Sequence, residues 1–201
     1  MSGHFEPTPE GGAAIALDEV EISIIRSLAV QLLELVGPGP AEDDDADPLA
    51  ELFTEGPSEP PSDPVLQRLF PNAYGDPDKP DDGSDEAAQQ RALSAEFRRF
   101  TENDLRARKR EDALAVVRSL DALTPAGDQA AVLRLAADES RRWLGALNDL
   151  RLAIGARLEV QDDDEADDLY RLPDSDPRKP MVMAYLWLGA LQETLVATLM
   201  D

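Results

Sequence analysis

The residues with the clearest capacity for chemistry are basic side chains crowded between residues 98 and 110. Six Arg or Lys residues fall in this stretch, against two acids, Glu102 and Asp104. On a helix, several of these charges share a face, so some would pair within the helix. The stretch could therefore neutralise the protein's own carboxylates, or it could dock an acidic protein partner. The candidate docking residues are Arg98, Arg99, Arg106 and Lys109.

Nucleic acid is a disfavoured partner because the chain as a whole is strongly acidic. It has 42 Asp and Glu against 19 Lys and Arg, a formal net charge of −23. The phosphate-driven part of binding would then be repulsive over most of the surface. A DNA-binding transcriptional regulator that uses a helix over 98–110 stays open as an alternative.

Catalytic and metal-binding constellations are missing from the pattern, so we predict no catalytic, cofactor-binding or metal-ligating residues. The chain has no Cys, and its one His is His4. Zinc sites and a Ser-His-Asp triad are therefore hard to build. No phosphate-binding loop or dinucleotide fingerprint appears. An enzyme with a carboxylate-lined pocket is the second alternative, because acids are too numerous to exclude it by counting.

Two acid runs, 42–47 and 162–168, are rich in oxygen ligands but lack the central Gly and terminal Glu of a calcium loop. They are typical of solvated linkers. We expect mobile acidic loops near 37–47, 75–85 and 161–180.

The element that must organise the chain is a helix over 138–159. Trp143, Leu147, Leu150, Ile154 and Leu158 recur at helical spacing. Small and apolar residues occupy its other sides too, which is typical of a helix buried all round. Asp138 is the expected N-cap. Beside the stripe, Asn148 and Arg151 form a candidate structural polar cluster, in which a half-buried Arg151 needs a carboxylate or a helix C-terminus.

Further helices are expected over 18–36, 63–70 and 182–199, with Asp18 and Glu21 forming a capping box on the first. A second short helix is expected near 47–53. Residues 86–123 are helical as well, but one helix and two helices meeting near Thr101 both fit. Leu93, Phe97 and Phe100 make one apolar face there.

Short strands are expected at 4–6, 13–17 and 132–135, with a turn over 8–12. The fold class is therefore mainly α: a single-domain helical bundle, 1–201, around a central buried helix, with a small β-hairpin or short sheet.

Residues 181–200 are long and apolar enough to be tested as a membrane span. Gln192 and Glu193 interrupt them, so a buried C-terminal helix is expected and no membrane contact. No signal peptide is seen at the N-terminus. We expect a cytoplasmic protein.

Several segments together resemble an actinobacterial family known as domain-of-unknown-function family 2017. They are SLAVQLLEL, DPVLQRLFPNAY, EFRRFTENDLRARK, WLGALNDLRLAIGARL and YLWLGALQET, in that order along nearly the whole chain. The resemblance implies a mainly helical fold and no established activity, hence no catalytic residues to transfer. Members lie near genes for a Clp-protease N-degron adaptor and a sulfur-carrier pathway, and some are labelled transcriptional regulators, which implies regulation or proteostasis.

The favoured function is a non-enzymatic cytoplasmic interaction or regulatory protein with an unidentified protein partner. A homodimer is also open. It would be indicated if the apolar face of Leu188–Leu199 or of Phe97–Phe100 were left uncovered.

Overall fold

The computed structural model describes residues 3–38, 55–75, 82–123, 130–160 and 169–200. The acid runs, the short helix expected near 47–53 and most of the loops expected near 37–47 and 75–85 lie outside these residues. Within them, two loop boundaries were wrong: Asp85 already belongs to helix α4, and Lys179 begins helix α7.

A small antiparallel sheet is built from three strands in the order β1-β2-β3: β1 (Glu6–Thr8), β2 (Gly12–Leu17) and β3 (Ala131–Ala136). The expected hairpin and the strand before the central helix are both present. In the register of β2 and β3, Ile15 faces Leu133 and Ala13 faces Leu135, and all four side chains are buried. The alternation of buried and exposed residues in these strands follows from their period of two.

Helix α1 (Glu19–Val36) begins as expected. The Asp18 carboxylate accepts a hydrogen bond from the Glu21 N–H at 2.8 Å, and Glu21 accepts one from the Asp18 N–H at 3.0 Å. Short helix α3 (Pro64–Leu69) has the same kind of start, with Asp63 as N-cap and Pro at its first position. It buries Val65 and Leu69, and Phe70 is buried just after it.

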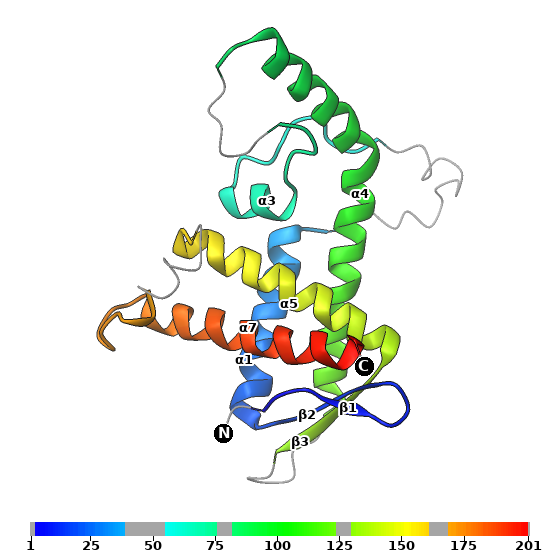
Figure 1. Ribbon diagram of the computed structural model, residues 1–201, viewed down its shortest axis with the longest axis vertical. Helices are drawn as coiled ribbons and strands as arrows, with labels where there is room; N and C mark the ends of the chain where they lie inside the picture. Colours follow the sequence, from blue (N-terminus) through cyan, green and yellow to red (C-terminus); the bar gives the residue numbers. More distant parts are fainter. Residues whose placement is uncertain (1–2, 39–54, 76–81, 124–129, 161–168, 201) are drawn as a thin grey trace.

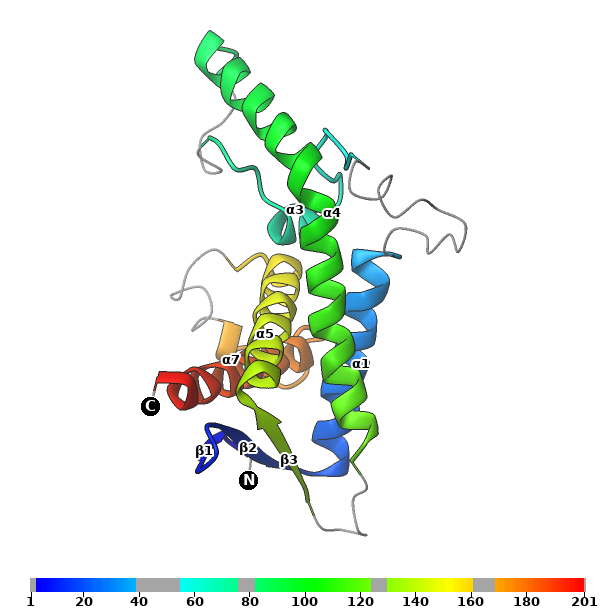
Figure 2. The ribbon, with the colours of Figure 1, turned by 90° about the vertical axis from the view of Figure 1, so that its right-hand side faces the viewer.

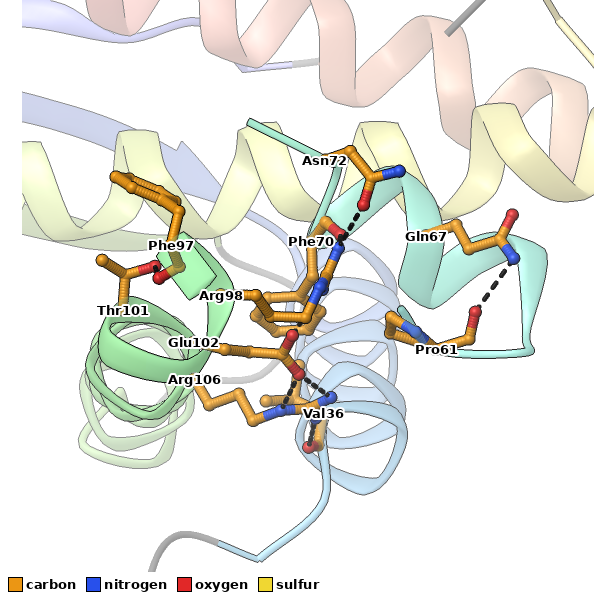
Figure 3. A network of polar contacts seen from close by, with 10 residues as sticks. All are labelled: Val36, Pro61, Gln67, Phe70, Asn72, Phe97, Arg98, Thr101, Glu102 and Arg106. Carbon is orange, nitrogen blue, oxygen red and sulfur yellow. Dashed lines mark hydrogen bonds and ion pairs between the residues drawn. The ribbon is translucent and has the colours of Figure 1, made fainter. Parts of the chain in front are cut away.

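Helix α4 (Asp85–Asp121) is one continuous helix. The second cap considered at Thr101 does not form, because its hydroxyl donates to the carbonyl of Phe97 one turn earlier, at 2.9 Å (Figure 3). Such a back-bond leaves the helical ladder intact.

Helix α5 (Ala137–Leu158) is the central helix. It packs against α1, α3, α4 and α7, and buries Trp143, Leu147, Leu150 and Ile154. Its predicted cap was wrong: Ala136 takes the N-cap position, and its N–H donates to the Glu139 carboxylate at 2.8 Å. Strand β3 runs directly into the helix, which begins at Ala137, so Asp138 already lies inside the first turn and cannot be its N-cap.

Helix α7 (Lys179–Met200) covers α5 and the first two strands. By length and composition alone it could cross a membrane. In this structure it buries Val182, Leu188, Leu191 and Leu195 against the rest of the chain.

Figures 1 and 2 show how these elements sit together. The sheet lies at one end of the molecule, with α1, α5 and α7 packed beside it, and α4 runs along the whole length. The N-terminal half of α4 extends past α1, α5 and α7. Helix α3 lies below this half of α4 in Figure 1 and packs against α5. The fold is mainly α with a short sheet around a central buried helix, as the sequence predicted.

Candidate functional site on helix α4

A chain of alternating charges runs along one side of α4 (Figure 3). Arg98 Nη1 donates to Glu102 Oε2 at 2.5 Å, and Arg106 donates to Glu102 Oε1 through Nε at 2.9 Å and Nη2 at 2.7 Å. Arg98 is 5% exposed and Glu102 is 1% exposed. At this burial the three side chains form an internal network, stabilised because each charge has a partner one turn away.

The network is completed by carbonyl and amide oxygens from distant parts of the chain. Arg98 Nη2 donates to the carbonyl of Phe70 at 3.1 Å and to Asn72 Oδ1 at 3.0 Å. Arg106 Nη1 donates to the carbonyl of Val36 at 2.7 Å, and its guanidinium lies 4.4 Å from the centre of the Phe70 ring. The network therefore fastens the segment after α3 and the C-terminal end of α1 to α4.

Arg110 adds a second clamp on the end of α1. It donates to the carbonyls of Leu33 and Gly37. Helix α1 has no basic residue in its own last turn. The carbonyls of Val36 and Gly37 at the negative end of the helix dipole thus accept from Arg106 and Arg110 of α4, and the Leu33 carbonyl accepts from both Arg110 and the Gly37 N–H.

The two other predicted docking residues are half-buried and engaged as well. Arg99 Nε lies 3.3 Å from a carboxylate oxygen of Glu55, and Lys109 Nζ donates to Asp149 Oδ1 at 2.6 Å. Of the four candidates, Arg98 and Arg106 share the carboxylate of Glu102, Lys109 borders them across the Phe70 ring at 5.8 Å, and Arg99 lies apart. Docking of an acidic partner by these residues stays a prediction.

These contacts weigh against a DNA-reading role for residues 98–110. Arg98 is buried, and Arg106, Lys109 and Arg110 each donate to protein acceptors, whereas Arg108 is exposed. Reading of DNA by this helix stays an untested alternative.

The contact between α4 and α5 holds two carboxylates in an unfavourable setting. Burial raises the pKa of the Asp149 carboxyl, and the hydrogen bond from Lys109 only partly opposes this. Burial also raises the pKa of Asp112, with nearby Asp149 acting in the same direction. The Asp112 carboxylate lies over Gly145: a Cβ at residue 145 would overlap Asp112 Oδ2, and this side chain would have to move.

An open groove lies beside these carboxylates, between α4 and α5. Its lining alternates in charge and consists of Asp104, Ala107, Arg108, Glu111, Asp112, Arg141 and Arg142. The enzyme alternative needs two carboxylates with separated pKa values in an apolar setting. The lining of this groove is instead mixed in charge. In the parts of the chain described above, no cluster of three His, Cys, Asp or Glu side chains could hold a metal ion.

The polar pair predicted on α5 is divided. Arg151 Nη1 donates to Gln192 Oε1 on α7 at 2.7 Å, and its guanidinium lies 5.2 Å from the centre of the Tyr185 ring. Its partner is thus an amide and an aromatic face, and the expected carboxylate or helix terminus is not used. Asn148 is exposed and hydrogen-bonds to Asp149.

The apolar face predicted at Leu93, Phe97 and Phe100 is exposed. Leu93 is 40%, Phe97 46% and Phe100 59% exposed, and Tyr74 beside them is 47% exposed. The rings of Tyr74 and Phe97 meet edge to face at 6.3 Å. The sequence predicted the apolar face itself from its helical spacing and named an uncovered Phe97–Phe100 face as the condition that would indicate a homodimer.

Comparison with known proteins shows to which family the chain belongs. The model of a family described as a domain of unknown function, DUF2017, matches residues 2–199. The chain belongs to this family. The earlier resemblance is therefore confirmed.

Relatives of this DUF2017 member carry a regulatory name. An oxidative stress regulator, AosR, from Mycobacterium tuberculosis is 30% identical over 185 residues, covering 90% of this chain and 78% of the relative. A Mycobacterium leprae protein whose name includes the same words is 35% identical over 187 residues, covering 90% of this chain and 79% of that protein. No solved structure matches the chain.

Proposed function

We propose that this chain is a non-enzymatic regulatory protein of the cytoplasm that acts by binding a protein partner through the N-terminal half of α4. The observation that carries the proposal is the exposure of Leu93, Phe97 and Phe100 on a helix whose other side is anchored by buried ion pairs. Contiguous exposed apolar side chains on a well-held element are typical of protein interaction sites.

The relatives' name supports a role in the response to oxidative stress. These 201 residues contain no cysteine, so a thiol switch within them is impossible. An oxidative signal carried by a thiol would then reach this protein through its partner. The family resemblance also implies a link to proteostasis, which we include in the proposal. The identity of the partner tests this link.

The test is photo-cross-linking in the native host, with a photoreactive amino acid in place of Phe100. We expect a discrete cross-linked protein that disappears when Phe97→Ser is added. A matched probe in place of Asp174, an exposed residue in the loop before α7, should not capture it. Equal capture from both positions, or none from either with and without added peroxide, would contradict the proposal.

A genetic test separates regulation from mere binding. A strain lacking the gene should differ from its parent in growth under peroxide. The wild-type gene should restore the growth of the parent, and the Phe97→Ser/Phe100→Ser double variant should not. Full restoration by a double variant present at normal level would show that regulation does not use this surface.

A further inference from the structure

The exposed apolar side chains of α4 are surrounded by acids. On a helix of 3.6 residues per turn, Leu93, Phe97 and Phe100 lie within about 60° of one another. Exposed Glu86 and Asp104 continue this face about two turns before Leu93 and one turn after Phe100, and exposed Glu96 flanks it. We call these six residues the acid-rimmed face.

Two basic residues of this half of α4 face away from it: Arg98 is buried in the network with Glu102, and Arg91 lies about 160° around the helix from Leu93. The guanidinium of Arg99 lies at the edge of the face, 4.9 Å from the centre of the Phe100 ring, and its charge is paired with Glu55. The acid-rimmed face is therefore apolar along its centre and acidic at its N-terminal end and on one side. At its other end Asp104 borders the groove that Arg108, Arg141 and Arg142 line.

We propose that the acid-rimmed face docks a basic amphipathic helix of a protein partner. Apolar side chains of that helix at intervals of three and four residues would cover Leu93, Phe97 and Phe100, and its Lys and Arg residues would meet the three acids. The net charge of −23 would speed the approach of such a partner. This inference rests on the proposed function and names the chemistry of its partner.

A second copy of this chain fits the face poorly. Two α4 helices packed through Phe97 and Phe100 would bring Glu86, Glu96 and Asp104 of one copy near the same acids of the other. Like charges across an interface cost binding free energy, and the net charge of each copy adds repulsion. The charge pattern therefore selects a basic partner over a homodimer.

The face is also held ready for binding. Ser94 Oγ accepts from the N–H of Tyr74 and donates to its carbonyl, both at 3.0 Å, which holds the backbone of the residue whose ring meets Phe97. The Arg98–Glu102–Arg106 network anchors the opposite side of the helix (Figure 3). A pre-organised surface loses less conformational entropy on binding.

The experiment measures binding of fluorescent helical peptides to the full chain by anisotropy. The probe is an 18-residue Leu/Lys peptide with Leu at amphipathic helical spacing. One control has the same composition in scrambled order, and a second has Glu in place of Lys. We expect the probe to bind at least about tenfold more tightly than either control.

Variants then locate the site. Phe97→Ser/Phe100→Ser should weaken probe binding at least about tenfold with unchanged circular dichroism. Glu96→Lys/Asp104→Lys should do the same, whereas Glu10→Lys/Asp174→Lys, an equal change of charge at exposed positions away from α4, should change it less than about twofold.

Three results would overturn the inference: equal loss in both charge variants, tight binding of the scrambled peptide, or a dimer in sedimentation that Phe97→Ser/Phe100→Ser converts to monomer. The cross-linking experiment separates this from failure of the proposed function. If position 100 captures a partner through a segment that is not basic and amphipathic, the proposed function stands and the assignment of partner chemistry fails.

Discussion

At the scale of single residues, Glu102 is a buried carboxylate that needs positively charged partners. Its carboxylate is 1% exposed and is neutralised from both sides by Arg98 and Arg106. A buried charge that keeps its partners is tolerated, whereas one that loses a partner is strongly destabilising. The network is therefore a place where one substitution acts on α1, α3 and α4 together.

Replacing Arg98 by Met tests this. The variant leaves Glu102 with one partner and leaves the Phe70 carbonyl without its donor, so the free energy of unfolding should fall by about 3–5 kcal/mol in urea titration. The neighbouring Arg99→Met removes a half-exposed pair with Glu55 and should cost less than about 1 kcal/mol. Similar losses in the two variants would show that the network is not specially stabilising.

Asp112 provides a test by pH. Burial raises its folded-state pKa above the ordinary value of 3.8, so its contribution to stability is present below that value and is lost as pH rises through the folded pKa. Asp112→Asn removes this dependence. The free energy of unfolding of the variant minus that of the wild type should therefore be larger at about pH 7 than at about pH 4.

Asp121 is the matched control of opposite sign. The hydrogen bond from Arg26 lowers the pKa of Asp121, so this carboxylate contributes stability above its ordinary pKa that is lost on acidification. Asp121→Asn should thus lose stability relative to the wild type as pH rises. Parallel pH profiles for the two variants would contradict both assignments.

At the scale of elements, the sheet and the helices are joined by one close backbone approach. Gly12 on β2 faces Ala136, the last residue of β3 before α5 begins. A Cβ at Gly12 would overlap the carbonyl oxygen of Leu135, which belongs to the backbone and cannot rotate away. The absence of a side chain at this position thus sets how closely β2 lies against the start of the central helix.

Gly12→Ala should accordingly lower the free energy of unfolding by about 1–3 kcal/mol, the usual range for overpacking. Ala14→Ser, a small change at a half-buried position of the same strand, should stay within about 0.5 kcal/mol. Thermal or urea unfolding measures both. A neutral Gly12→Ala would mean that the strands can separate slightly at no cost.

At the scale of the whole molecule, the net charge of −23 opposes compaction. Self-repulsion of this kind is screened by salt, because the Debye length falls from about 30 Å at 0.01 M to about 3 Å at 1 M. The internal use of Arg98, Arg106, Lys109 and Arg110 concentrates positive charge along α4, where it relieves nearby carboxylates and leaves the rest of the surface acidic.

The melting temperature should therefore rise between low salt and about 0.5 M NaCl, with each kcal/mol gained equal to about 2–4 °C at this chain length. The Glu10→Lys/Asp174→Lys variant lowers the net charge from −23 to −19, since each substitution removes one negative and adds one positive charge. It should melt higher than the wild type at low salt and respond less to added salt. A fall in melting temperature with salt would contradict this account.

Features that depend on neighbours within a few residues could be predicted from the sequence alone. The capping box of Asp18 and Glu21, the hairpin of β1 and β2 and the buried stripe of α5 follow from spacings of three, two and four residues. The capping box forms within one turn and the hairpin between neighbouring strands, and the stripe of α5 is apolar enough to be buried by whichever helices pack on it, so the pattern of residue types is sufficient to predict them.

Only the tertiary structure decided which faces of these elements are covered. Leu93, Phe97 and Phe100 have the spacing of a core face, yet they lie on the part of α4 that extends past α1, α5 and α7. Local sequence predicts a surface position for Arg98. It is instead buried, because Phe70 and Asn72 supply hydrogen-bond acceptors from 28 and 26 residues away in sequence. Burial depends on which distant segments reach a given face, and that information is absent from local periodicity.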